Sequence, residues 1–395
     1  MKVFGLSIAL VLFFTSSYAQ LPEVSLLNAG LLKTKKEAYL RKDKEVTRQV
    51  DFVLKTADGY LDTKPKSVLD KSFTPPSGSK HDYMSLAPYF WPDPAKADGR
   101  PYIRKDGERN PEIRTITDGT YLSDLNNKCK FLSLAYYFTN TEKYAAKASQ
   151  LMQIWFLNPE TKMNPNLNYA QAIRGVNDGR GIGIIETRSL ADLADWAGLL
   201  TGSASWNTKE MQGLKDWYKQ YLNWMMTSKN GQDEHHAKNN HGTHYDTQIV
   251  AFALFTGDRK LAAQTLKESL KRIPVQIEPD GQQPLELERT NAYGYSTMNL
   301  NGWFNLAILG EKLDIDLWNY STTDGRSLRK ALDWLIPYTI GDKPKDHKQI
   351  SPYNKGEMYR PLLLAGLKYK SSTYLEAAAA LPRTNENLMT DLLYR

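Results

Sequence analysis

The strongest constraint on the fold is a helical pattern that starts near Tyr121 and continues almost to the end of the chain. Apolar residues recur at helical spacing, and short turns with Gly, Asn, Asp or Ser separate the segments. A further helical segment precedes them at 26–57, and no convincing run of alternating strand residues interrupts the series. We therefore expect an all-α chain. The predicted helices lie near 121–139, 141–157, 187–200, 208–227, 245–256, 258–272, 298–312, 325–339, 357–369 and 373–381.

A faint internal repeat indicates how these helices are paired. Residues 138–146 (FTNTEKYAA) match residues 255–263 (FTGDRKLAA), and residues 370–378 form a looser third copy. Each copy ends one helix, turns and starts the next, with Thr141 and Asp258 as polar N-caps in the first two. Repeated antiparallel helix pairs close into a solenoid or toroid. The repeat thus favours an incomplete (α/α) toroid, with a plain helical bundle as the alternative.

The segment before this helical series has a different composition. Residues 64–94 are rich in Pro, Ser and aromatic side chains, and the prolines exclude helix over much of the segment. The loop character persists to Pro111. A structureless stretch of this length inside a compact chain is usually functional.

Residues 1–19 are predicted to be a signal peptide. Lys2 precedes an apolar run at 3–14, and small residues then offer a cleavage site before Gln20. The apolar run is too short for a membrane span, and no later stretch approaches the roughly 20 apolar residues that a span requires. We expect residues 20–395 to form a single exported domain, periplasmic or secreted.

The charge and the cysteine content limit the partners and the chemistry. The formal net charge is +7, and a basic surface attracts polyanions, which include nucleic acid, anionic membranes and acidic polysaccharides. For an exported protein, an acidic polysaccharide is the expected partner rather than nucleic acid. Cys129 is the single cysteine, so no intramolecular disulfide can form. It lies in an apolar segment, where a buried structural thiol is expected.

Four of the six histidines fall within ten residues, at His235, His236, His241 and His244. Three interpretations are open. His241 and His244 with a carboxylate could bind zinc, but Gly242 is expected to interrupt any helix there and no HExxH pattern is present. A solvated polar loop is the structural alternative. The third interpretation is an acid/base and carboxamide cluster that includes Asn240 and faces a cleft.

A second polar cluster follows the turn signal at residues 280–281. Arg289 stands near two tyrosines, Tyr293 and Tyr295. In the structural alternative, Arg289 pairs with Glu286 or a neighbouring acid and the tyrosines pack in the core.

Together the two clusters supply the side chains that β-elimination from a uronic acid requires. The C5 carboxylate must be neutralised, which Asn, Arg or protonated His can do by hydrogen bonds or charge. A base must take the C5 proton, and an acid must protonate the leaving O4. An arginine beside a tyrosine lowers the pKa of the phenol. The residues of these types are Asn240, His241, Arg289 and Tyr295, and their spacing alone does not show that they converge.

Several segments between about 81 and 305 resemble the alginate-lyase superfamily of polysaccharide lyases, which are helical toroids that include alginate and glucuronan lyases. The resemblance favours the toroid over the bundle. Residues 83–94 and the NNHG segment at 239–242 are the more specific matches. The matching segments are YMSLAPYFWPDP at 83–94, PYIR at 101–104, DG at 106–107, NPE at 110–112, QAI at 171–173, GRGIGIIE at 179–186, NNHG at 239–242 and the stretch from 280 to 289.

By this resemblance, Asn240 would hold the substrate carboxylate and His241 would assist neutralisation or act as the base. Arg289 would lie near the carboxylate, and a tyrosine would protonate the leaving oxygen and could also take the C5 proton. The related lyases place this tyrosine six or seven positions past the arginine, which selects Tyr295. In a helix, Tyr293 at i+4 would share a face with Arg289 instead, but the glycine between the tyrosines argues against helix.

The resemblance also assigns the walls of the cleft. Tyr89 and Trp91 would stack on sugar rings, although the same aromatic residues could simply anchor the loop. Arg104 and Arg180 would bind neighbouring carboxylates, and Glu186 would either orient Arg180 or touch substrate. The predicted substrate-binding residues are Tyr89, Trp91, Arg104, Arg180, Glu186 and Tyr293.

The resulting hypothesis is an exported lyase that cleaves a 1,4-linked polyuronate, namely alginate or glucuronan, by chemistry that needs no metal or cofactor. Two rivals remain. An inverting glycoside hydrolase on the same fold would use two carboxylates from among Glu186, Glu286 and Glu288. A non-catalytic protein that binds acidic glycans would have no need for Asn240–His241 and Arg289–Tyr295 together.

Overall fold

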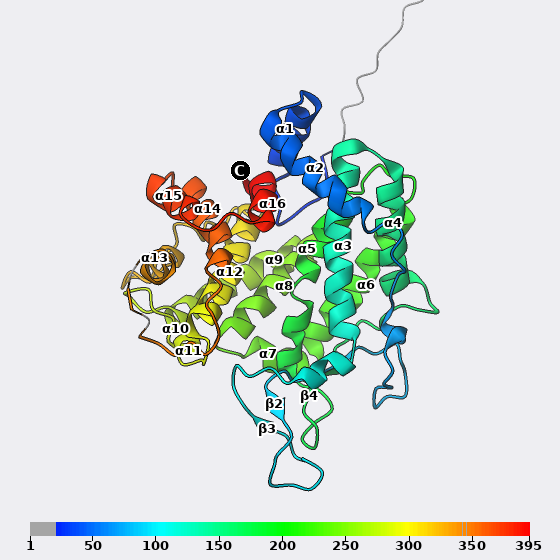
Figure 1. Ribbon diagram of the computed structural model, residues 1–395, viewed down its shortest axis with the longest axis vertical. Helices are drawn as coiled ribbons and strands as arrows, with labels where there is room; N and C mark the ends of the chain where they lie inside the picture. The colour runs from blue at the N-terminus through cyan, green and yellow to red at the C-terminus, as the bar shows by residue number, and fades with distance from the viewer. Residues whose placement is uncertain (1–20, 342, 345) are drawn as a thin grey trace, which may run out of the picture.

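The computed structural model describes residues 21–341, 343–344 and 346–395 (Figure 1). The predicted signal peptide and Gln20 lie outside the described residues. No helix among the described residues combines the length and apolar character needed to cross a membrane.

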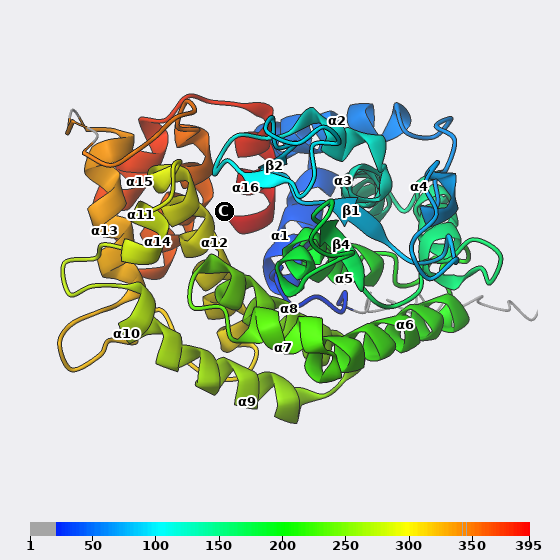
Figure 2. The ribbon, with the colours of Figure 1, turned by 90° about the horizontal axis from the view of Figure 1, so that it is seen from below.

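The body of the fold consists of two layers of helices. The inner helices contact one another in chain order, α3 with α5, α5 with α8, α8 with α12 and α12 with α14. Each is followed along the chain by an outer helix, and Figure 2 shows α6, α9 and α13 on the outside. The inner helices are α3 (Asp118–Thr139), α5 (Leu190–Gly198), α8 (Asn240–Thr256), α12 (Ala292–Glu311) and α14 (Tyr359–Lys368). The outer helices are α4 (Glu142–Met152), α6 (Thr208–Thr227), α9 (Arg259–Ser269), α13 (Leu328–Thr339) and α15 (Ser372–Ala379). This arrangement confirms the predicted all-α toroid.

The two central inner helices, α8 and α12, are buried on almost every side. In α8 every residue from Gly242 to Ala253 is buried, and in α12 Trp303 and Phe304 are fully buried. Cys129 in α3 is also fully buried, which agrees with a structural thiol.

Two glycines that were expected to interrupt helices lie inside them. Gly242 lies inside α8. A Cβ at this position would clash with the Ala237 carbonyl and the Arg272 guanidinium, so glycine permits their close approach. Gly294 belongs to α12, and a Cβ there would meet nothing within 4 Å. Both helices therefore start earlier than predicted.

The three copies of the repeat are the turns between α3 and α4, α8 and α9, and α14 and α15. At the turn residues Asn140, Gly257 and Lys370 the backbone is left-handed, with φ values of 53°, 90° and 51°. The side chain of Asp258 accepts a hydrogen bond from the backbone N–H of Leu261, whereas the side chain of Thr141 makes no capping bond. The repeat thus encodes the reversal between an inner helix and its outer partner.

The two ends of the described chain meet and narrow the gap in the toroid. The predicted helical segment 26–57 is two helices, α1 (Ala29–Leu40) and α2 (Lys44–Asp58), because Lys42 adopts a φ of 60° between them. The last helix, α16 (Asn385–Tyr394), packs against α1 and α2. α16 was not predicted.

The proline-rich segment runs over one mouth of the toroid and carries most of the short strands (Figure 1). β1 (Met84–Leu86) pairs in parallel with β4 (Tyr169–Ala172), and β2 (Phe90–Trp91) pairs with β3 (Ile103–Arg104) in antiparallel fashion. The remaining short elements are α7 (Lys229–His235), α10 (Ile273–Gln276), α11 (Pro284–Leu287), η1 (Val68–Asp70), η2 (Pro111–Thr115), η3 (Gln153–Leu157), η4 (Gly181–Thr187), η5 (Leu270–Arg272) and η6 (Lys355–Met358).

A buried ion pair fastens this segment to the first residue of α3. The Lys71 amine lies 2.9 Å from the Asp118 carboxylate, and both side chains are 0% exposed. The same carboxylate accepts the Met84 backbone N–H at 3.0 Å. The position of β1 at the mouth therefore depends on this pair.

Candidate active site

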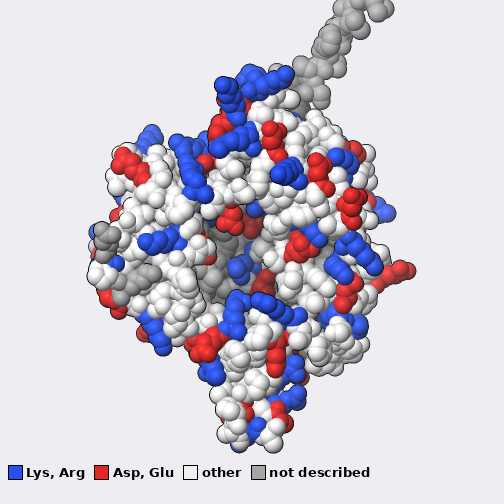
Figure 3. All heavy atoms as spheres, viewed as in Figure 1, with Lys and Arg blue, Asp and Glu red and all other residues white. Residues whose placement is uncertain are grey.

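A cavity of about 730 Å³ opens at the centre of the face shown in Figure 3. Its wall comes from α3, α5, α8, α12, α14 and α16, together with the loop residue Tyr89. A second cavity of about 770 Å³ lies beneath β1 and is lined by Arg109 and Arg114. Because both cavities share Arg188 and Ser189 as lining residues, they are neighbours along one cleft.

Asn240 is the first residue of α8 and is fully buried. Glu286 in α11 accepts hydrogen bonds from the backbone N–H of Asn240 at 2.6 Å and from its Nδ2 at 2.7 Å. A carboxylate at a helix N-terminus is also favoured by the helix dipole. Glu286 thus determines which way the Asn240 carboxamide faces. Asn239 caps the same helix by accepting the His241 backbone N–H at 3.3 Å.

The imidazole of His241 is oriented by Glu234, a buried residue of α7. His241 Nδ1 lies 2.8 Å from Glu234 Oε1, and the His241 side chain is 13% exposed. When Nδ1–H donates to a carboxylate, the neutral ring carries its lone pair on Nε2. The arrangement can therefore present a basic nitrogen.

Arg289 lies between a loop carboxylate and a phenol. Its guanidinium binds Asp106 through Nη2 at 2.8 Å and through Nε at 3.2 Å, and stacks 3.8 Å from the centre of the Tyr295 ring. Burial alone would raise the Asp106 pKa, but hydrogen bonds from Arg289 and Thr290 hold it well below its usual range. The alternative that Arg289 pairs with Glu286 or a neighbouring acid is wrong, because its partner, Asp106, comes from the distant loop.

Tyr295 donates a hydrogen bond from its Oη to the Oη of Tyr89 at 2.7 Å, and both residues line the main cavity. Burial and the contact with Tyr89 raise the pKa of Tyr295, and they outweigh the opposing charge of Arg289. The expectation that the arginine makes the phenolate accessible is therefore wrong for this structure. Tyr295 is a neutral phenol, which suits a proton donor.

Glu286 connects the two sequence clusters. Burial raises the pKa of Glu286, while the hydrogen bonds from Asn240 and the charges of Arg289 and His241 act in the opposite direction. The predicted residues Asn240, His241, Arg289 and Tyr295 thus belong to one connected region. Tyr295 lines the main cavity, the side chains of His241 and Arg289 are 13% and 16% exposed, and Asn240 is buried.

One of the predicted binding residues, Glu186, lines the second cavity, and another, Arg180, contacts its lining residue Gln171. Arg180 donates to the backbone oxygen of Gln171 at 3.2 Å and to its side-chain oxygen at 2.9 Å, and its guanidinium lies 5.1 Å from the Phe90 ring centre. Glu186 lines the second cavity and accepts hydrogen bonds from the hydroxyls of Tyr83 and Ser85, both at 2.7 Å. Glu186 therefore anchors the loop and has no direct hydrogen bond to Arg180.

Trp91 and Arg104 lie on the β2–β3 pair, which projects from the body of the toroid (Figure 1). Trp91 Nε1 donates to the Glu108 carbonyl at 2.9 Å, so this ring anchors the loop. The Arg104 side chain is 57% exposed and pairs with Asp106 at 2.7 Å. Neither residue lines the main cavity.

Tyr293 does not face the cleft, so its predicted contact with substrate is wrong. Its side chain is fully buried, is stacked near the Trp334 ring and donates to the Asp346 carboxylate at 3.0 Å. Residues 293 and 295 are both in α12, where two positions correspond to roughly 200° of rotation. They therefore point to different sides of the helix, and only Tyr295 reaches the cavity.

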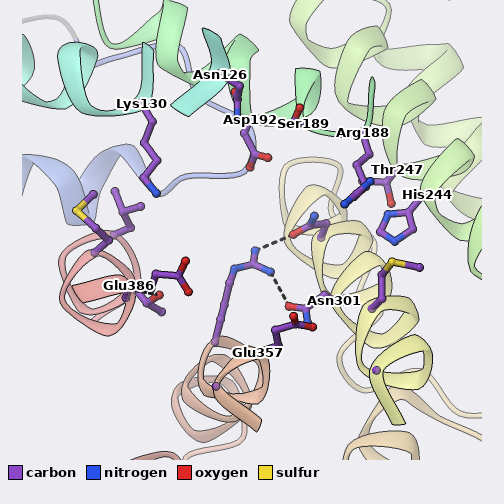
Figure 4. Close-up of a pocket in the computed structure, with 18 of the residues that line it drawn as sticks. Asn126, Lys130, Arg188, Ser189, Asp192, His244, Thr247, Asn301, Glu357 and Glu386 are labelled. Carbon is purple, nitrogen blue, oxygen red and sulfur yellow. Dashed lines mark hydrogen bonds between the residues drawn. The ribbon is translucent and has the colours of Figure 1, made fainter. Parts of the chain in front are cut away.

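Arg188, which had no predicted role, and His244, one of the four clustered histidines, also line the main cavity (Figure 4). Burial first, then the charges of Arg188 and His241, lower the pKa of His244 to about 3, so its imidazole is neutral. Within the described ranges no three His, Cys, Asp or Glu side chains come together as a metal site, so the zinc alternative for His241 and His244 is not supported.

The chain is similar over most of its length to known alginate lyases. A family model described as alginate lyase matches residues 67–347. The chain belongs to this family. The crystal structure of an alginate lyase from Bacteroides ovatus has 40% sequence identity and a TM-score of 0.90, covering 95% of this chain and 99% of that chain. No curated protein matches the chain significantly.

Two more distant structures share the fold. Alginate lyase A1-III from Sphingomonas species A1 has 15% identity and a TM-score of 0.60, covering 95% of this chain and 96% of that chain. A variant of alginate lyase A1-III complexed with a tetrasaccharide has 14% identity and a TM-score of 0.63 over the same shares of the two chains. The family model and the structure from Bacteroides ovatus confirm the predicted family and enzyme class: the protein is a polysaccharide lyase, and the hydrolase and binding-protein alternatives are set aside.

Proposed function

We propose that this lyase cleaves 1,4-linked polyuronates by β-elimination, with mannuronate-rich alginate and glucuronan as the leading substrates. The alginate lyase of Bacteroides ovatus supports this substrate class, as do the arginines along the cleft. The observation that carries the proposal is the position of Tyr295. Its phenol lines the cavity and stacks on Arg289, beside the Glu286 carboxylate that holds Asn240.

In the proposed reaction, Asn240 and Arg289 neutralise the C5 carboxylate, which makes the C5 proton acidic. A base removes this proton, the electron pair forms the C4=C5 double bond and the C4–O4 bond breaks. Tyr295 donates its proton to the departing O4. The electrons and protons balance without any external reagent.

The hydrogen-bond partners of the two candidate groups, His241 and Tyr295, support the assignment of the base. Tyr295 holds its proton and donates it to Tyr89, which suits the acid role. His241 has its Nδ1 against Glu234, which leaves Nε2 for accepting a proton. We therefore assign the base role to His241 and the acid role to Tyr295.

A substrate panel tests the proposal. The purified protein is mixed with polymannuronate, polyguluronate and glucuronan, and the ultraviolet absorbance of the new C4=C5 bond is followed. We expect turnover of at least one of the three by the wild-type protein and a loss in Tyr295→Phe. Absence of turnover on all three by the folded protein would refute the proposal.

We also propose that the protein is exported to the periplasm or the medium, on the basis of residues 1–19. Fractionation of the producing cell with N-terminal sequencing should yield a mature chain that begins near Gln20. Recovery of a chain that still begins at Met1 in the cytoplasm would contradict export.

A further inference from the structure

The main cavity also has a basic region, the inner end, that none of the proposed catalytic roles uses. Its wall there is formed by Lys130 of α3, Arg188 between η4 and α5, and Arg360 of α14 (Figure 4). Arg360 lies past residue 347, where the match to the family model ends. The inner end is thus built partly by a segment that the sequence resemblance did not cover.

The three cations surround Asp192, with Lys130 and Arg188 on opposite sides of the pocket (Figure 4). The charges of Arg360, Lys130 and Arg188 all act on the carboxyl group of Asp192, which lines the same wall. None of the three is within ion-pair distance, 4.0 Å, of a carboxylate oxygen among the described residues. Cations that line one cavity without forming ion pairs with carboxylates leave positive charge available for an anionic ligand.

Arg188 is the most available of the three. Its side chain is exposed although protein surrounds it, because it faces the cavity. Among the described residues, its guanidinium makes one hydrogen bond, from Nη1 to the Ile185 carbonyl at 3.1 Å, so most of its donors have no partner there. Because Arg188 and Ser189 line both cavities, the inner end adjoins the second cavity, and a polymer would pass Arg188 between the two.

Arg360 is held in place by neutral groups rather than by an acid. Nη2 donates to Asn305 Oδ1 at 2.7 Å and to the Tyr394 hydroxyl at 3.3 Å, and Nη1 lies 3.5 Å from Asn301 Oδ1. Neutral acceptors orient the guanidinium, and no carboxylate among the described residues forms an ion pair with it. A bidentate carboxylate partner suits such a pre-organised fork.

Carboxyl groups also face this end of the cavity, at Asp192, Glu357 and Glu386. Burial raises the pKa of Asp192 and of Glu357, so burial weakens the negative charge that opposes the cations. Carboxyl oxygens accept hydrogen bonds from hydroxyl groups. A ligand that carries both a carboxylate and hydroxyls matches this mixture, and a uronosyl ring carries both.

We propose that Arg188, Lys130 and Arg360 form a subsite that binds carboxylates of uronosyl residues other than the cleaved one, with Asp192 and Glu357 accepting hydrogen bonds from their hydroxyls. The inference rests on the proposed function for the identity of the polymer. The subsite discriminates by substrate length, because only chains that extend from the Tyr295 region to the inner end can occupy it.

The test compares Arg188→Gln with wild type on a series of oligouronates of increasing length and on the polymer. We expect KM for long substrates to rise roughly 10- to 100-fold, as for the loss of a charge-assisted hydrogen bond, while kcat changes little. The effect should vanish on the shortest oligomer that is cleaved. Arg360→Gln should show the same pattern, and Lys267→Gln on the outer face of α9 is the matched control.

Three outcomes are decisive. A KM rise that depends on length supports the subsite, whereas an equal loss on every length, or none, overturns it. Binding of a saturated oligouronate to Tyr295→Phe, with and without Arg188→Gln, separates the two proposals. If the wild type turns over no polyuronate but binding still depends on Arg188, the subsite stands and the proposed function fails. If the wild type is active and Arg188→Gln does not change binding, only the proposed subsite is refuted.

Discussion

Glu286 is the residue that holds the two halves of the site together, and its change to glutamine should therefore impair catalysis without removing any group that reacts. Glutamine has nearly the same size, but it carries no charge and its amide nitrogen cannot accept a hydrogen bond. At least one of the two bonds from Asn240, at 2.6 and 2.7 Å, must be lost.

The magnitude follows from the kind of bond. A hydrogen bond to a charged group contributes about 1.5–3 kcal/mol. If this free energy orients Asn240 in the transition state, its loss lowers kcat/KM by about 10- to 150-fold. The same bonds anchor the first residue of α8, so the thermal unfolding midpoint should also decrease.

The assay is the rate of double-bond formation on the best polyuronate, measured for wild type, Glu286→Gln and Glu288→Gln. Glu288 is two positions away and exposed, so its variant is the matched control and should stay within about 2-fold of wild type. A folded Glu286→Gln protein with wild-type kcat/KM would show that Glu286 is not needed to orient Asn240. An equal loss in Glu288→Gln would show that the effect is not specific to Glu286.

Three further predictions concern the phenol and the loop anchor. Tyr295→Phe should lower kcat about 10²- to 10⁴-fold through loss of the general acid, whereas Tyr89→Phe should cost about 10-fold or less, as steady-state kinetics can measure. Because the Tyr295 pKa lies above the ordinary value of about 10, the pH profile of kcat should show no decline that depends on Tyr295 below pH 10; such a decline below pH 9 would contradict the acid role. Lys71→Met should lower the free energy of unfolding by about 3–5 kcal/mol in urea titration, because it leaves Asp118 buried and unpaired. The Asp118 pKa is already raised to about 6, so the folded state favours its protonated form, and the loss should be larger at pH 8 than at pH 5. A loss under about 1 kcal/mol at both pH values would contradict this role.

The helices were predictable where periodicity and turn residues agreed. The prediction for α6 matches at both ends, and the repeat located three reversals that the structure makes with left-handed residues. Two of the errors came from glycines, and the break at Lys42 and the helix α16 were also missed. Gly242 and Gly294 were interpreted as breaks, but in a toroid an inner helix tolerates glycine where another chain segment or a cavity occupies the space of a side chain.

The site was predictable as a set of residue types but not as a geometry. The spacing between Asn240 and Arg289 contains no sign that Glu286 bridges them, because that contact depends on how α11 packs against the start of α8. Asp106 was quoted only as part of a loop motif, yet it holds Arg289 from 183 positions away. Tyr295 was chosen correctly as the cavity-facing phenol, but the supporting argument that the segment is not helical was wrong.

Arg188 was missed because nothing in its local sequence distinguishes it from the many other basic residues. What distinguishes it is the combination of an enclosed position, an exposed guanidinium and the lack of an ion pair within the described part of the chain. Such a combination appears only when helices from distant parts of the chain are assembled around one cavity.

The central claim is that the proposed substrate is cleaved by elimination with Tyr295 as the proton donor. The most direct measurement is mass spectrometry of the products formed from polymannuronate in water enriched in heavy oxygen. Elimination should give products that have an unsaturated non-reducing end and carry no heavy oxygen from the cleavage step. These products should be lost in Tyr295→Phe. Saturated products that are one water heavier and carry the oxygen label would contradict it.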